Sequence, residues 1–218
     1  MTPGGDDQVP GYFTVAGRGE AELTEKRSRF LSAAVPASSA DDAMAFIAEV
    51  RAAHKTASHN CWAYLLRGGG MRYSDDGEPQ GTAGVPMLEV LKKNAAEDCA
   101  VVVTRYFGGT LLGAAGLVRA YSAAAKLAVD AAGIIEMRLF ARFSLVMAYP
   151  LYGRCELLLR DLGARTVHID FGAEVSLEAA VLSEDYPRLE KQLLEITAGT
   201  VAARPVCEEY LAMPRSPV

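Results

Sequence analysis

The chain has 218 residues, of which 50% are hydrophobic and 22% are charged, and its formal net charge is -5. This composition is typical of a globular protein with one large or two small cores. The negative net charge argues against a protein that binds nucleic acid over its whole surface, although a local basic patch is compatible with it. No run approaches the roughly 20 apolar residues of a membrane span, and the start of the chain has no signal-peptide pattern. We therefore expect a cytoplasmic protein without a membrane partner.

The first part of the chain predicts a strand and a helix behind a loose start. Residues 1–19 are expected to form a flexible tail, and 22–35 a strand entered through basic residues. That basic cluster is also typical of a solvated surface. Capping residues at 38–42 then predict a helix through Ala53. Its apolar residues at helical spacing are Ala43, Phe46, Ile47 and Val50.

Residues 74–86, here called the acidic loop, follow a strand candidate at 61–66. They hold three carboxylates, three glycines and two prolines, and they show neither helical nor strand periodicity. The carboxylates of Asp75, Asp76 and Glu78 could bind a hard cation, with His59 as an acid or base. Asp-Gly and Glu-Pro are also good turn chemistry, and a histidine at the mouth of a strand is often structural. No metal-binding spacing is present, and we expect no cofactor.

Residues 108–116, here called the glycine turn, come after a buried strand at 98–104 and lead into an alanine-rich helix at 112–132. Glycines allow positive φ or close approach, and a helix start offers unpaired N–H groups. With Arg105 before it and Arg119 on the exposed side of the helix, the turn could hold an anion. Tight packing of strand on helix is the alternative. The glycines concerned are Gly108, Gly109, Gly113 and Gly116.

The last third of the chain predicts a separate domain. Gly133 is expected to close the preceding helix and to mark a boundary, which gives domains at 20–134 and 135–218. Beyond it the pattern indicates a strand, a helix, two strands, a helix and a strand, followed by a tail from Leu211. This is the ferredoxin-like order. The expected fold class is α+β with two domains. The four cysteines are scattered and expected to be free thiols.

Four motifs in this order resemble the IMPACT family in its bacterial, YigZ-type form. They cover roughly residues 20–133, with weaker similarity in the C-terminal domain. Ala115 departs from the pattern, since a second glycine is expected beside Gly116. The motifs lie at 26–31 (KRSRFL), 57–64 (ASHNCWAY), 75–84 (DDGEPQGTAG) and 105–121 (RYFGGTLLGAAGLVRAY).

The resemblance implies an N-terminal α/β sandwich similar to domain four of elongation factor G and a C-terminal domain similar to its domain five. It also implies a link to the control of translation, with RNA or the ribosome as partner and a protein partner as a further option. A metal-dependent hydrolase acting on a phosphate-bearing substrate is the alternative suggested by the acidic loop. A single site built from both segments requires the acidic loop and the glycine turn to face one cleft.

Overall fold

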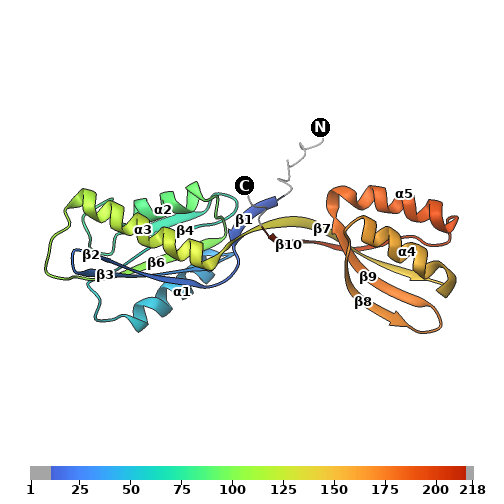
Figure 1. The fold of residues 1–218 in the computed structure, drawn as a ribbon, viewed down its shortest axis with the longest axis horizontal. Helices are drawn as coiled ribbons and strands as arrows, with labels where there is room; N and C mark the ends of the chain where they lie inside the picture. The colour runs from blue at the N-terminus through green and yellow to red at the C-terminus, as the bar shows by residue number, and fades with distance from the viewer. Residues whose placement is uncertain (1–10, 215–218) are drawn as a thin grey trace. The chain divides into compact units, whose positions relative to one another are not determined.

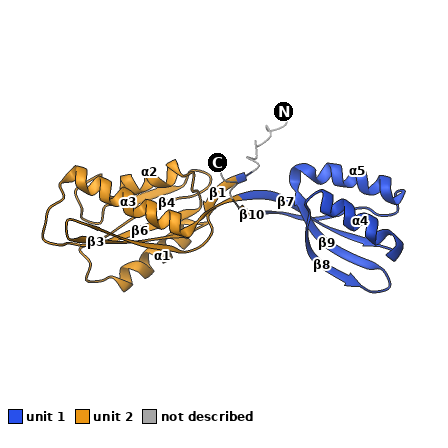
Figure 2. Cartoon of the chain, in the orientation of Figure 1, with its two compact units in different colours: residues 1–11, 137–211 blue, residues 12–136, 212–218 orange. Residues whose placement is uncertain are grey.

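The computed structural model describes residues 11–214, and it confirms the expected mixed α+β architecture with two domains (Figure 1). The chain divides between Glu136 and Met137 into two compact units (Figure 2). Among the described residues, Tyr12–Glu136 and 212–214 form the N-terminal unit, and Gly11 and Met137–Leu211 form the C-terminal unit. No helix within residues 11–214 is long and apolar enough to cross a membrane.

The N-terminal unit is a five-stranded sheet with helices on both faces (Figure 1). The strand order is β2-β3-β6-β4-β5, with antiparallel pairing throughout. Helices α2 and α3 cover one face and α1 covers part of the other, so each face has its own apolar core. The elements of this unit are β1 (Gly11–Val15), β2 (Gly19–Glu25), β3 (Ser28–Pro36), α1 (Ala40–Ala53), β4 (His59–Leu65), β5 (Met71–Ser74), α2 (Gly84–Lys93), β6 (Cys99–Tyr106) and α3 (Ala114–Ala132).

Two expectations about the start of the chain are wrong. Gly11–Val15 form strand β1 inside the segment expected to be a tail, while residues 1–10 lie outside the described part. The single strand expected over 22–35 is a hairpin, in which Glu25 pairs with Ser28 and Lys26-Arg27 is the two-residue turn. Both turn residues have positive φ, 45° and 67°. Such turns usually contain Asn-Gly, so the turn lacked its usual sequence signal.

The predicted helix ends are confirmed by their caps. The Ser39 side chain accepts a hydrogen bond from the Asp42 N–H at 3.1 Å and starts α1, whose four predicted apolar residues are buried. Gly133 closes α3 with φ 72°. At the other end of α3, Gly113 is the N-cap with φ 74° and offers no side chain to the first free N–H groups. The glycine turn therefore does open a helix with an uncapped start.

The C-terminal unit has the predicted ferredoxin-like order. β1, β9 and β10 all pair with β7, and β8 pairs with β9 as an edge strand, so this sheet has five strands. α4 and α5 contact each other and cover one face over a single apolar core. Strand β10 extends to Pro214, so the tail expected from Leu211 is wrong for residues 211–214. The elements are β7 (Ile134–Met147), α4 (Tyr149–Asp161), β8 (Arg165–Phe171), β9 (Val175–Leu182), the 3-10 turn η1 (Ser183–Asp185), α5 (Tyr186–Thr197) and β10 (Arg204–Pro214).

Candidate functional site

A pocket of about 480 Å³ lies where the acidic loop meets the glycine turn, and we call it the loop–turn pocket. Strand β6 ends in its wall, and α3 begins there. The two segments that the sequence singled out therefore face one cleft, as a shared site requires. The lining residues are Ser58, His59, Gly77, Glu78, Pro79, Arg105, Phe107, Leu111, Leu112, Gly113, Ala114 and Leu117.

A buried ion pair forms the floor of this region. Nη1 of Arg105 donates to Oε1 of Glu78 at 2.6 Å, and both side chains are buried, with exposures of 6% and 4%. Nη2 of Arg105 donates to Oγ of Ser28 at 3.2 Å, and the Tyr121 hydroxyl donates to the same Oε1 of Glu78 at 2.9 Å. The Glu78 carboxylate thus joins the acidic loop to β6 and α3, and Arg105 extends this network to Ser28 of β3.

Arg105 holds the site together and does not face solvent. Its guanidinium lies 5.5 Å from the Phe30 ring centre and 5.3 Å from that of Phe107. Its Nε is buried and has no hydrogen-bond partner within residues 11–214. Because its two terminal nitrogens are bound to Glu78 and Ser28, Arg105 is not an exposed contact for a phosphate.

Groups around the ion pair are kept neutral by burial. Burial raises the pKa of Tyr121, with the neighbouring Cys61 and Glu78 adding to the effect. Burial likewise raises the pKa of Cys61 to about 12. Tyr121 therefore stays a hydrogen-bond donor and Cys61 a protonated thiol at neutral pH, and Cys61 is no candidate nucleophile.

His59 has a defined tautomer in its neutral form. Its Nδ1 lies 2.8 Å from the main-chain carbonyl oxygen of Asp76. Because a carbonyl oxygen only accepts, Nδ1 must carry the hydrogen. Nε2 then carries the lone pair, 3.9 Å from Oε1 of Glu78. His59 thus presents an acceptor at the pocket when it is neutral.

The carboxylates of Asp75 and Asp76 are occupied by the protein itself. Asp75 accepts the N–H groups of Gly81, Ala83 and Gly84 at 2.8, 3.0 and 2.8 Å, which binds the acidic loop to the start of α2. Asp76 accepts the Asn60 N–H at 2.7 Å and pairs with Arg51. Within residues 11–214 no group of three or more His, Cys, Asp or Glu side chains could hold a metal ion. The carboxylates of Asp75 and Asp76 therefore act as hydrogen-bonding groups that hold the acidic loop in place.

The four glycines of the glycine turn have different surroundings. A Cβ on Gly108 would lie 2.0 Å from the main-chain oxygen of Arg27, so the close approach at this position is made by the β2–β3 turn. Gly109 and Gly113 have φ of 81° and 74° with open space beside them. Gly116 lies on α3, where a Cβ would be 3.0 Å from Leu112. Only Gly113 lines the loop–turn pocket.

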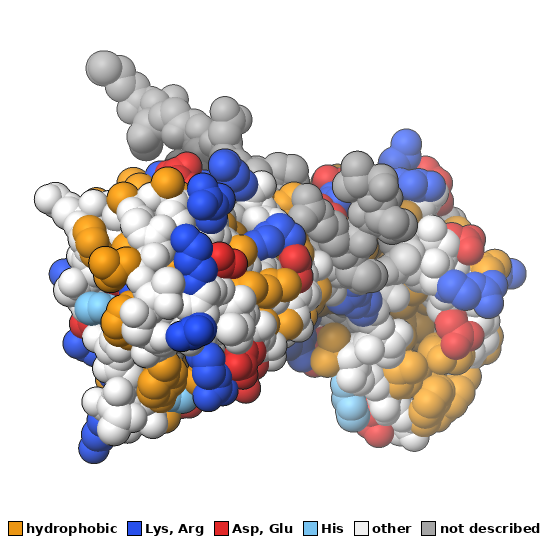
Figure 3. Space-filling view, turned by 60° about the vertical axis from the view of Figure 1, so that its left-hand side comes forward, with side chains coloured by type: hydrophobic (Ala, Val, Ile, Leu, Met, Phe, Trp, Pro, Cys, Tyr) orange, Lys and Arg blue, Asp and Glu red, His pale blue; other side chains and the backbone are white. Residues whose placement is uncertain are grey.

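Arg119 lies in a neighbouring depression of about 250 Å³, which we call the basic hollow. Lys26 from the β2–β3 turn lines it too, and Glu25 is the one carboxylate in its lining. Leu112 lines both the basic hollow and the loop–turn pocket, so the two are adjacent. Figure 3 turns this end of the N-terminal unit towards the viewer and shows Lys and Arg side chains beside apolar patches.

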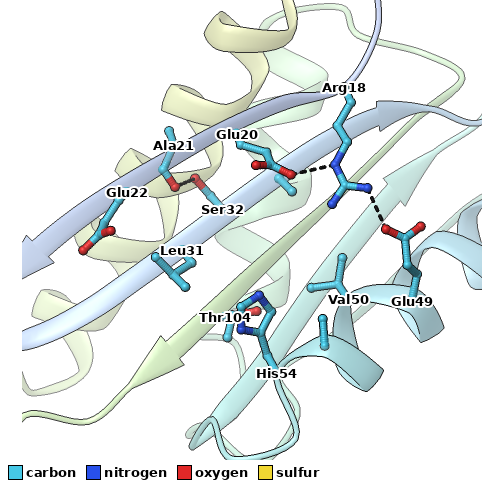
Figure 4. Close-up of a pocket in the computed structure, with 12 residues that line it drawn as sticks. Arg18, Glu20, Ala21, Glu22, Leu31, Ser32, Glu49, Val50, His54 and Thr104 are labelled. Atoms are coloured by element: carbon cyan, nitrogen blue, oxygen red, sulfur yellow. Dashed lines mark hydrogen bonds and ion pairs between the residues drawn. The ribbon is translucent and has the colours of Figure 1, made fainter.

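A third depression, of about 380 Å³, lies on the α1 face of the same sheet (Figure 4). Nε of Arg18 donates to Glu20 at 2.7 Å and Nη1 to Glu49 at 2.6 Å. Both hydrogen bonds raise the pKa of Arg18, and the one to Glu49 has the larger effect. The charged side chains of this depression are thus largely paired with one another. None of the site residues predicted from the sequence lines it.

Sequence reasoning missed the roles of three residues near the predicted ones. Tyr121 and Ser28 share the hydrogen bonds of Glu78 and Arg105, and Phe107 is a half-exposed ring in the pocket wall. All three stand within or beside the motifs. No local pattern, however, signals contacts between residues 43 to 77 positions apart.

Comparisons with known proteins agree with this two-part organisation. The Impact N-terminal domain matches residues 26–129, and a domain of unknown function, DUF1949, matches residues 145–200. IMPACT family member YvyE of Bacillus subtilis is 37% identical over 190 residues, covering 86% of this chain and 88% of that protein. IMPACT family member YigZ of Escherichia coli is 31% identical over 180 residues, covering 81% and 88%.

A solved structure shows the same arrangement of elements. It is described as the crystal structure of a hypothetical protein, is 28% identical, and matches with a TM-score of 0.60 over 91% of this chain and 98% of its own. The sequence relatives extend through both units, and the motifs that build the loop–turn pocket lie within the matched Impact N-terminal domain. The chain therefore belongs to the IMPACT family.

Proposed function

We propose that the protein acts in translation by binding RNA, free or within the ribosome, through one end of its N-terminal unit. This end comprises the β2–β3 turn, the basic hollow and the loop–turn pocket. Family membership supports the link to translation, and one relative, from Dictyostelium discoideum, is named Protein IMPACT homolog, with 37% identity over 97 residues. The surface itself supports RNA as the partner.

The observation that carries the proposal is the basic β2–β3 turn. Lys26 and Arg27 both adopt the left-handed conformation, which costs a residue with a side chain roughly 1–2 kcal/mol. Asn-Gly would form the same turn with less strain. Two exposed cations thus occupy positions where local stability favours uncharged residues. Strain of this kind supports a functional role for the charges.

Three cations at this end are available to a partner. Lys26, Arg27 and Arg119 are exposed, and none forms an ion pair with another residue of the described range. Gly108 keeps the turn in place, because its backbone packs against Arg27 and its N–H donates to Ser28 Oγ at 3.3 Å. A half-exposed aromatic ring, Phe107, follows directly on the strand. Cations beside an aromatic pocket are the usual means of binding single-stranded RNA.

We expect the triple variant Lys26→Asn, Arg27→Gly, Arg119→Ala to bind RNA more weakly while staying folded. The measurement is fluorescence anisotropy with a labelled single-stranded RNA of about 12 nucleotides over a salt series. Loss of three phosphate contacts should reduce the salt slope by about 2, at about 0.7 per contact. The Asn-Gly turn should leave the melting temperature unchanged or raise it, because the left-handed strain is relieved.

The matched control is the variant Lys92→Ala, Lys93→Ala, Lys126→Ala. It removes the same number of charges from exposed positions that line neither the basic hollow nor the loop–turn pocket. Its affinity and salt slope should stay close to those of the parent. Equal losses in both variants would mean that RNA responds only to net charge, and would refute the proposed surface.

A further inference from the structure

One oxygen of the buried Glu78 carboxylate has no donor. Oε1 accepts from Arg105 and Tyr121, whereas Oε2 accepts no hydrogen bond from any residue in 11–214. The side chain is only 4% exposed and lines the loop–turn pocket. Oε2 thus opens onto the pocket without a protein donor, and a ligand that displaces solvent there must supply an N–H or O–H group to avoid leaving this acceptor unpaired. An anion placed there would instead be repelled by the negative charge of the carboxylate.

A second acceptor stands beside it. Nε2 of neutral His59 carries a lone pair, because Nδ1–H is used by the Asp76 carbonyl. Nε2 lies 3.9 Å from Oε1 of Glu78 and makes no hydrogen bond of its own among the described residues. The pocket therefore presents two neighbouring acceptors, and it favours a ligand with two neighbouring donors.

The remaining walls are apolar and suit a flat ring. Phe107 is 47% exposed and Leu111 is 82% exposed at the mouth, while Leu112 and Leu117 lie deeper and are buried. Exposed aromatic side chains next to cations are the platforms on which unpaired bases stack. The volume of about 480 Å³ falls within the range of small-molecule sites.

We infer that the loop–turn pocket takes one unpaired guanine base of the bound RNA, a specificity that rests on the proposed function. Guanine carries adjacent donors, the ring N1–H and the exocyclic N2 amino group, which match Glu78 Oε2 and His59 Nε2. Adenine, cytosine and uracil each place an acceptor beside their donor, and that acceptor would face an acceptor of the pocket. Phe107 stacks on the ring.

The test uses labelled oligouridine RNAs of about 12 nucleotides that differ at one central position. That position carries guanosine, inosine, adenosine, cytidine or uridine. The parent should bind the guanosine RNA about tenfold more tightly than the uridine RNA. Inosine should fall between them, since it keeps N1–H and lacks the amino group.

Three variants distinguish hydrogen bonding to the base from stacking on Phe107 and from a general loss of folding. Phe107→Leu should weaken every RNA about fivefold and leave the guanosine-to-inosine ratio unchanged. Glu78→Gln and His59→Leu should each remove the preference for guanosine. His59 lies at the pocket edge, so His59→Leu keeps the test decisive if Glu78→Gln fails to fold. Circular dichroism establishes folding in each case.

The outcomes distinguish the inference from the proposed function. Equal affinity of the parent for all five RNAs would overturn the guanine assignment and leave RNA binding standing. If no RNA binds, the proposed function fails, and thermal shifts with guanosine and inosine 5′-monophosphate decide the pocket separately. A larger shift with the guanosine nucleotide supports the assignment, and equal shifts overturn it.

Discussion

The variant Arg105→Met should lower the free energy of unfolding of the N-terminal unit by about 3–5 kcal/mol, the cost of leaving a buried charge without its partner. Arg105 supplies the only cation bound to Glu78 within residues 11–214, apart from His59 when it is protonated. Without it the Glu78 carboxylate keeps only the Tyr121 hydroxyl at normal hydrogen-bond distance. The charge would then face the apolar side chains of the pocket.

Trp62 makes this measurement specific to the N-terminal unit. It is the single tryptophan of the chain and is buried against the α1 face of the sheet. Its fluorescence during urea unfolding therefore reports this unit alone. The double variant Arg105→Met, Glu78→Gln should recover part of the loss, since the uncompensated charge is gone. A double variant as unstable as the sum of the single ones would mean that the two side chains act independently.

The second large effect is expected at Asp75. Its carboxylate accepts three backbone N–H groups of the acidic loop, and hydrogen bonds to a charged group contribute roughly 1.5–3 kcal/mol each when removed singly. Asp75→Ala should destabilise the N-terminal unit by about 3 kcal/mol or more, measured by the same Trp62 fluorescence. Asp75→Asn should cost less, because its one carbonyl oxygen can still accept the Ala83 and Gly84 N–H groups.

Asp130→Asn is the control for Asp75. Asp130 is exposed, and Lys126, one helical turn away, is its only ion-pair partner within residues 11–214, so losing this charge should cost less than about 0.5 kcal/mol. If Asp75→Ala costs no more than Asp130→Asn, the hydrogen bonds of the acidic loop do not stabilise the unit. The role assigned to the loop carboxylate as a structural group would then be wrong.

The sequence was most informative where the structure depends on neighbouring residues. Ser39 starts α1 and Gly133 ends α3, because capping is a local interaction between a side chain or a positive φ and the next turn. The order of elements in the C-terminal unit follows from similar local patterns. The β2–β3 hairpin was missed, because Lys26-Arg27 carries none of the glycine or asparagine that marks such a turn.

The candidate site could be predicted as a list of residues but not as a set of contacts. The motifs pointed to His59, Glu78 and Arg105, which do line one pocket. They did not show that Arg105 forms a buried ion pair with Glu78, because the two residues are 27 positions apart and come together only when the sheet forms. Nor did they place Arg119 in a separate hollow with Lys26. Such contacts depend on tertiary packing, which no local spacing encodes.

The most direct test of RNA binding by this end of the molecule is a photo-crosslinking map of the whole chain. Single-stranded RNA containing 6-thioguanosine would be crosslinked to the parent protein, and the attached peptides identified by mass spectrometry. We expect crosslinks in the peptides that contain Lys26-Arg27, His59 and Phe107. Crosslinks confined to the C-terminal unit, or to the α1 face around Arg18 and Glu49, would contradict it.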